Sequence, residues 1–212
     1  MKRVFFTAFA LAMICGLLCG CSLFSEFKYI NNRDGTCTLT QMKSDENGVF
    51  VIPEKINGLT VTAIGENISG GGYRITFLHS DAYYKLNGNL IKGTVKIPES
   101  VTTIDLAALD GFISSIEVSE QNAVYSSIDG MLYNKDKSEL IRTPRFGVSN
   151  RVIPNGVKII KDGAFSYCDF LESVTIPESV IEIEGERFSG AYIEVSERNP
   201  VYSSVDGVLT KR

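Results

Sequence analysis

The chain has 212 residues, of which 44% are apolar, and its 25 acidic residues outnumber its 21 basic ones, giving a formal net charge of −4. This balance argues against a nucleic-acid partner, because nucleic-acid-binding surfaces concentrate Lys and Arg. A single histidine, His79, and scattered cysteines do not supply the three or four clustered side chains that a metal site needs. We therefore expect no metal and no cofactor.

Residues 1–20 have the pattern of an export signal. Two basic residues precede an apolar run that ends at Leu18 and is short for a membrane span, which needs about 20 residues. The next stretch, Leu18-Cys19-Gly20-Cys21, resembles a bacterial lipobox, which implies cleavage before Cys21 and lipid attachment to its sulfur. An ordinary signal peptide or a retained anchor is the alternative. We predict a lipoprotein signal peptide, a membrane-bound lipid anchor and a short tether at 21–26.

Residues 27–48 have the pattern of a β-hairpin. Two β-prone runs, 27–30 and 36–41, flank a polar turn that contains Asp34-Gly35, and Asp-Gly between such runs favours a hairpin. Repeats follow this segment, and the first repeat of an array has no neighbour on one side. We therefore expect an N-terminal capping hairpin.

Short apolar-x-apolar segments recur over residues 49–212, and several of them end at proline, which cannot continue a hydrogen-bond ladder. Their last apolar residues are Ile52, Phe77, Ile97, Val118, Ile153, Ile176 and Val195. Phe77 is included because the 45 residues from Ile52 to Ile97 equal about two periods. Such a period predicts a solenoid, in which each repeat buries its apolar face against its neighbours.

The repeat pattern is complete over residues 153–176 and continues beyond them. Leu171-Glu-Ser-Val-Thr-Ile-Pro177 is preceded by Gly163-Ala-Phe-Ser-Tyr-Cys168 and followed by Val180-Ile-Glu-Ile183. This pattern resembles the leucine-rich repeat of the BspA, or Treponema pallidum, type of surface lipoprotein. The resemblance implies a mainly β leucine-rich-repeat solenoid with short irregular segments on its back side. That family is defined by a scaffold, so the resemblance transfers no catalytic residue.

A surplus of residues at 119–144 interrupts the period and begins again near the C-terminus. Segments 116–132 and 193–209 are identical at 13 of 17 positions. We expect 119–144 to form a β-hairpin that protrudes from the solenoid, and 196–212 to form a partial second insert. The last strand, at Val208-Leu209, lacks the return segment of the first insert, so we expect it to fray and to leave an exposed edge.

Strand alternation predicts which side chains of the repeats face solvent. If Val174 and Ile176 point into the core, their neighbours on the strand point outward. The same register exposes a row on the concave face that comprises Thr94, Lys96, Ser115, Glu117, Ser173, Thr175, Tyr192 and Glu194. Repeat proteins use such rows to bind ligands; solvated polar positions are the alternative. Tyr73, Tyr83 and Tyr84 form a second candidate contact site; packing over the convex wall is the alternative.

Two cysteines, Cys37 and Cys168, remain after the signal peptide and the lipidated residue. The resemblance places a small inward-facing residue at position 168, so we expect a buried thiol there. A disulfide between them is the alternative, although they should lie near opposite ends of the solenoid. His79-Ser80-Asp81 combines suggestive residue types, but members of a catalytic triad meet across a fold and are rarely adjacent. We assign no catalytic residue and expect no enzyme.

The predicted protein is lipid-anchored in the bacterial cell envelope, at the outer membrane or the cell surface. The resemblance implies adhesion, so the expected function is adhesin-like binding of an extracellular protein or glycan. A structural subunit of an envelope assembly, held close to the membrane by the short tether, is the alternative. The oligomeric state stays open.

Overall fold

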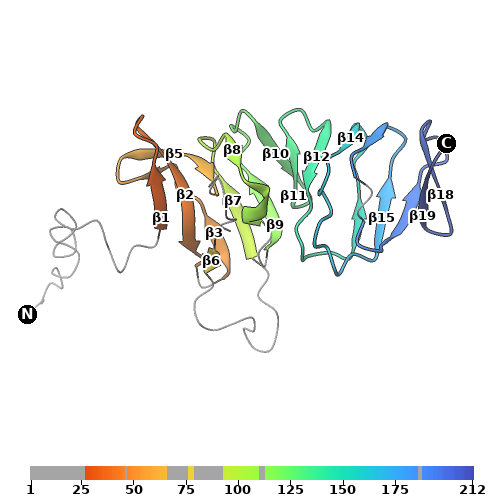
Figure 1. Cartoon of the computed structure of the whole chain (residues 1–212), viewed down its shortest axis with the longest axis horizontal. Helices are drawn as coiled ribbons and strands as arrows, with labels where there is room; N and C mark the ends of the chain where they lie inside the picture. Colours follow the sequence, from red (N-terminus) through yellow and green to blue (C-terminus); the bar gives the residue numbers. More distant parts are fainter. Residues whose placement is uncertain (1–26, 46, 66–75, 79–92, 110–112, 186–187) are drawn as a thin grey trace, which may run out of the picture.

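The computed structural model describes residues 27–45, 47–65, 76–78, 93–109, 113–185 and 188–212. The described chain is an elongated stack of short strands that runs from β1 at one end to β18 and β19 at the other (Figure 1). The predictions for residues 1–26, for His79 and for Tyr73, Tyr83 and Tyr84 lie outside the described residues. Within the described ranges, no helix is long and apolar enough to cross a membrane.

The predicted N-terminal hairpin forms from β1 (Phe27–Asn31) and β2 (Thr36–Lys43), which pair antiparallel. Its turn is held by the Asp34 carboxylate, which accepts hydrogen bonds from the Thr36 backbone N–H at 2.9 Å and from the Thr36 hydroxyl at 2.6 Å. Strand β2 also pairs parallel with β5 (Leu59–Ile64), which β4 (Lys55–Ile56) joins antiparallel. The hairpin therefore closes the N-terminal end of the stack (Figure 1).

Six short strands form the front face of the solenoid in two parallel sheets. The first sheet contains β3 (Val49–Val51), β7 (Gly93–Ile97) and β9 (Ile113–Val118). The second contains β13 (Asn150–Val152), β15 (Ser173–Ile176) and β17 (Tyr192–Val195). All predicted strand-ending residues except Phe77 therefore end a front strand or follow one directly.

The predicted repeat around Phe77 is wrong as a front-face turn. Strand β6 (Thr76–Leu78) forms, but it pairs with β2 through Phe77 and Met42. Strand β3 pairs directly with β7, with Phe50 opposite Val95. A spacing of two periods counts residues along the chain and carries no information about which strands are hydrogen-bonded, so it could not distinguish these arrangements.

The back of the solenoid contains short strands where irregular segments were expected. Strand β8 (Thr103–Ile104) pairs parallel with β5, and the 3₁₀ helix η2 (Leu106–Leu109) follows it. Strand β12 (Glu139–Arg142) pairs parallel with β14 (Ile159–Ile160), which pairs in turn with β16 (Glu182–Ile183). The regular period brings successive back segments into register, so their backbone groups hydrogen-bond to one another.

The insert forms a hairpin from β10 (Tyr125–Ile128) and β11 (Met131–Asn134), but it does not protrude. Strand β11 also pairs with β12, which places the insert at one edge of the back sheet. Met131, Leu132 and Tyr133 are all fully buried. Three consecutive large side chains cannot remain on a solvent-exposed hairpin without losing the hydrophobic contribution of their burial, so the hairpin is part of the core.

The insert divides the interior into two hydrophobic clusters. The N-terminal core contains buried residues from Cys37 to Leu132, and the C-terminal core contains buried residues from Met131 to Tyr202. Successive side chains of a strand point to opposite sides, so Met131 and Leu132 enter different cores. Strand β11 is therefore the wall between the two halves of the solenoid.

The repeat of the insert forms a second hairpin, β18 (Tyr202–Val205) with β19 (Val208–Lys211), at the C-terminal end of the stack (Figure 1). The expected fraying is wrong: β19 pairs with β18 along its whole length, and the backbone N–H of Arg212 donates to the carbonyl of Val201 at 2.8 Å. Among the described strands β19 pairs only with β18, so its other edge has no strand partner, as expected. The side chain of Val208 is 65% exposed. We call 116–132 the first hairpin module and 193–209 the second.

One buried asparagine fastens each module to the repeat before it. Asn122 donates from Nδ2 to the carbonyls of Pro98 and Val101, and its Oδ1 accepts from the N–H groups of Val124 and Tyr125. In the second module Asn199 makes the same four bonds, to the residues Pro177, Val180, Val201 and Tyr202. Both asparagines are at most 2% exposed.

Both remaining cysteines are buried free thiols. Cys37 lies in the N-terminal core and Cys168 in the C-terminal core, so the alternative of a disulfide between them does not apply. The expectation of a buried thiol at position 168 is confirmed.

Candidate binding surface

The predicted register of the front strands is confirmed. Val174 and Ile176 are fully buried, whereas Ser173 and Thr175 between them are partly exposed. On β17, Ile193 is buried while Tyr192 and Glu194 face solvent. The first sheet repeats the pattern, so the predicted side chains do lie on one face of their strands. Their role in binding stays a prediction.

In the second sheet the exposed side chains line up across the strands. Asn150, Ser173 and Tyr192 are register partners in one row, and Val152, Thr175 and Glu194 are partners in the next. The Ser173 hydroxyl donates to Asn150 Oδ1 at 2.7 Å, and the Thr175 hydroxyl donates to Glu194 Oε2 at 3.5 Å. We call Ser173, Thr175, Tyr192 and Glu194 the C-terminal patch.

In the first sheet the predicted side chains are also neighbours. Thr94 is opposite Ser115, and Lys96 is opposite Glu117. Lys96 Nζ lies 3.3 Å from Glu117 Oε2, and both side chains are about half exposed. An ion pair this exposed contributes about 0–1 kcal/mol to stability. We call these four residues the N-terminal patch.

The two patches are separate, which corrects the expectation of one continuous row. The turn of the first hairpin module occupies the position beside β9 where the next front strand would pair: the N–H of Ile116 donates to the carbonyl of Gly130 at 3.0 Å. From the other side, the Arg151 guanidinium donates to the carbonyl of Asp129 at 3.1 Å. An insertion between two strands alters the ladder without altering the alternation of either strand, so the sequence pattern could not reveal this separation.

The second module has the same position beside β17, where it supports Tyr192. The N–H of Ile193 donates to the carbonyl of Gly207 at 2.9 Å. A Cβ at Gly207 would lie 2.2 Å from the Tyr192 ring, so the ring packs directly over this glycine, whose φ is +78°. Tyr192 is nevertheless 52% exposed. The module therefore fixes one side of the ring and leaves the other open.

Two exposed apolar side chains on the same strands were not among the predicted residues. Val51 lies beside Lys96, and Val152 lies beside Thr175; both are mostly exposed. The alternation that predicted the polar residues would also have found them, because Val51 and Val152 each stand next to a buried residue on the strand. The C-terminal patch thus combines an aromatic ring, hydroxyl groups and a carboxylate, and the apolar side chain of Val152 lies next to it.

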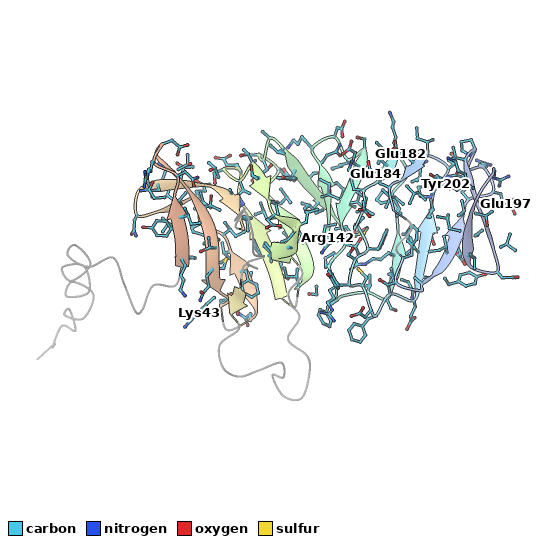
Figure 2. All side chains as sticks on the ribbon, in the orientation of Figure 1. Lys43, Arg142, Glu182, Glu184, Glu197 and Tyr202 are labelled. Atoms are coloured by element: carbon cyan, nitrogen blue, oxygen red, sulfur yellow. The ribbon has the colours of Figure 1, made fainter. Side chains whose placement is uncertain are left out.

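The carboxylates of the back sheet give no evidence for acid–base catalysis. Figure 2 labels Glu182 and Glu184, which belong to β16 and the residue after it. Glu184 lies 2.5 Å from Lys161 Nζ. The hydrogen bond from Lys161 lowers the pKa of the Glu184 carboxyl, whereas a general acid needs a raised pKa. Among the described residues, no group of three His, Cys, Asp or Glu side chains could hold a metal ion.

One known protein-family model matches part of the chain. Residues 145–198 match the family model described as a BspA type leucine rich repeat region of six copies. This segment contains the C-terminal patch and the complete repeat. No curated protein matches the sequence.

Several solved structures are similar to this chain. One is a leucine-rich repeat protein from Eubacterium ventriosum, with 20% identity, 76% of this chain and 66% of that chain covered, and a TM-score of 0.37. A leucine rich cell surface protein from Faecalibacterium prausnitzii has 17% identity, 90% and 58% coverage and a TM-score of 0.39. The pneumococcal vaccine antigen PcpA has 13% identity, 80% and 67% coverage and a TM-score of 0.36. The chain thus spans less than two thirds of the first two proteins.

Proposed function

We propose that this chain is a lipid-anchored protein of the bacterial cell envelope whose C-terminal patch binds an extracellular protein or glycan. The match of residues 145–198 to the BspA type leucine rich repeat region supports this proposal. The observation that carries the proposal is the placement of Tyr192. Its ring rests on Gly207 and remains half exposed between residues that offer hydrogen bonds.

The chemistry of the patch supports binding of a ligand with both polar and apolar surface. A tyrosine offers a large contact area with only two side-chain torsions to immobilise, and contact with Gly207 already restricts this ring. Glu194 accepts hydrogen bonds, and the exposed Val152 extends the apolar area. The N-terminal patch is a weaker candidate, because it contains no aromatic side chain and its two charged groups already pair with each other.

The anchoring part of the proposal depends on the sequence around Cys21, which has the lipobox pattern. It is tested by feeding labelled palmitate to intact cells and treating them with protease. We expect a labelled protein that the protease removes. A labelled but protected protein would contradict surface exposure and favour a subunit of an internal envelope assembly, and an unlabelled protein would contradict the lipid anchor.

The binding part is tested by screening the purified protein against immobilised host matrix proteins and a glycan array. Tyr192→Ala should weaken any specific interaction at least tenfold, the size of effect typical of a central aromatic contact, about 2 kcal/mol. Glu182→Gln, an exposed change on the back sheet, is the matched control and should leave binding unchanged. Equal loss in both variants, or loss in neither, would contradict the assignment of the C-terminal patch.

A further inference from the structure

A small cavity, which we call the flank cavity, lies beside β13, and Arg151 of this strand lines it. It is formed by the loop that joins β12 to β13 and by the segment that precedes β15, and its volume is about 50 Å³. The lining includes Thr143, Arg145, Arg151 and Phe170. A single water needs about 10–15 Å³, so the cavity has room for one small polar group.

Several residues that line the cavity have a buried polar atom without a hydrogen-bond partner. Within the described part of the chain, four buried side-chain polar atoms have no hydrogen-bond partner, and three of them belong to lining residues: Thr143 Oγ1, Arg145 Nε and Arg151 Nε. A buried donor without an acceptor costs about 1–3 kcal/mol. Three such groups at one cavity indicate that an acceptor belongs there.

The charge of the site points to an anion. Arg151 is 4% exposed and donates only to the carbonyls of Asp129, at 3.1 Å, and Phe146, at 3.3 Å. No described carboxylate lies within ion-pair distance of it, and the Asp129 carboxylate acts on it only from farther away. A buried cation without a counter-ion is unfavourable, and an arginine keeps its charge where another group would lose it.

The remaining neighbours add no negative charge inside the cavity. Burial raises the pKa of the Cys168 thiol to about 11, so this lining residue is neutral at pH 7. Arg145 pairs with Asp169 at 2.7 Å through Nη2, which leaves its Nε available. The site therefore keeps two cationic donors and one hydroxyl for a ligand.

The rim of the cavity is apolar and exposed. The rings of Phe146 and Phe170 lie 5.3 Å apart, and Phe170 is 59% exposed. Val148, another lining residue, is also mostly exposed. A ligand whose acidic group enters the cavity can therefore rest its less polar part against these side chains.

We propose that this flank cavity binds the carboxylate group of a ligand. Arg151 Nε–H and Arg145 Nε–H donate to its oxygens, and the Thr143 hydroxyl donates to the same group. A carboxylate offers about four acceptor positions and one negative charge, which matches the three donors and the missing counter-ion. None of the lining residues belongs to the C-terminal patch, and this inference does not depend on the proposed function.

The test uses the full chain in detergent and sodium acetate as the probe. The Nε–Hε signals of the arginines are followed by NMR while acetate replaces chloride at constant ionic strength. We expect the signals of Arg145 and Arg151 to shift saturably. The absence of a saturable shift would overturn the proposal and leave the cavity to water. Saturation by phosphate without saturation by acetate would also overturn it, because the site would then select a tetrahedral anion.

Two matched variants distinguish an effect on acetate binding from the gain in stability that follows when a buried hydroxyl without a partner is removed. Without acetate, Thr143→Val should raise the Tm, because it removes a buried hydroxyl that has no partner; it should also weaken acetate binding about tenfold. Ser100 Oγ is the fourth unpartnered atom and lies outside the cavity, so Ser100→Ala should raise the Tm and leave acetate binding unchanged. Equal acetate affinity in the wild type and Thr143→Val would overturn the proposal. Tyr192→Ala should not affect acetate binding, which keeps this test independent of the front face.

Discussion

The two hairpin modules have nearly the same sequence and the same hydrogen bonds but different surroundings. In the first module, Met131 and Leu132 are buried on opposite sides of a wall between two cores. In the second, the equivalent Val208 is 65% exposed and Leu209 is only partly buried. The comparison shows that a module defines its own conformation and its contact with the preceding strand, whereas what covers its outer face is defined elsewhere in the chain.

The largest difference is expected when the same leucine is removed from each module. Leu132→Ala should destabilise the protein by about 3 kcal/mol, because a fully buried leucine leaves a cavity. Leu209→Ala should cost about 1 kcal/mol, because its side chain is partly solvated in the folded state. Denaturant unfolding of both variants measures the two values. Equal losses would mean that the outer face of the second module is covered in solution.

The asparagines test what the modules have in common. Asn122→Ala and Asn199→Ala each remove four hydrogen bonds and leave buried backbone groups unpartnered, so each should cost about 2–3 kcal/mol. The expected result is a similar loss at both positions, measured by the same unfolding experiment. A loss of stability in Asn122→Ala alone would show that the second module does not depend on the hydrogen bonds of Asn199.

The turn glycines test how tightly each module packs on its front strand. Gly130→Ala should cost about 2 kcal/mol, because the residue has a positive φ and its new Cβ would lie 3.2 Å from the backbone Cα of Ser115. Gly207→Ala introduces similar strain, but its Cβ meets the Tyr192 ring, which can rotate into solvent. We expect about 1 kcal/mol there, together with a change in tyrosine fluorescence. Identical thermal shifts in the two variants would contradict this difference in packing.

The smallest effect is expected from the ion pair on the back sheet of the C-terminal half. The pKa of Glu184 is lowered by the hydrogen bond from Lys161, and the pKa of Lys161 is raised by the same bond. The Glu184 contribution is therefore present above the ordinary carboxyl pKa of 4.5 and is lost as the pH falls through the lower folded-state value. The Lys161 contribution is lost as the pH rises above 10.5 through its raised folded-state value.

Thermal unfolding of the wild type and Glu184→Gln across pH checks this sign. The wild type should be slightly more stable at pH 7, and the difference should shrink as the pH falls below 4.5. Glu182→Gln, two residues earlier, is the control, because it removes a carboxylate of β16 without removing the hydrogen bond between Lys161 and Glu184. A difference that grows below pH 4.5 would contradict the assignment.

Much of the fold followed from local patterns in the sequence. Alternation around Val174 and Ile176 predicted the front strands and the side chains they expose, and Asp34-Gly35 predicted the first hairpin. The Phe77 strand and the separation of the patches did not follow, because both depend on which strands pair across the fold. Because the two modules have nearly the same sequence, the sequence also did not show that their surroundings differ. The one local signal is the residue after them, where Tyr133 in the first module is replaced by Thr210 in the second.

The sequence predicted which residues belong to the candidate site, but it did not predict which of them lie together. Tyr192 was found from the register, but its support by Gly207 requires the second module to fold back onto β17. The flank cavity could not be found from the sequence, because Thr143 and Arg151 come from opposite ends of a loop and acquire a common environment only when the repeats stack. Buried arginines without an acidic neighbour in the sequence give no distinctive pattern.

The most direct test of the account is amide hydrogen exchange of the full chain with and without the ligand that the binding screen identifies. Binding at the C-terminal patch predicts slower exchange in β15 and β17 and in the turn at Gly207, with no change in β7 and β9. Slower exchange confined to the back strands β14 and β16, or to the first sheet, would contradict the central claim that the second module presents Tyr192 for binding.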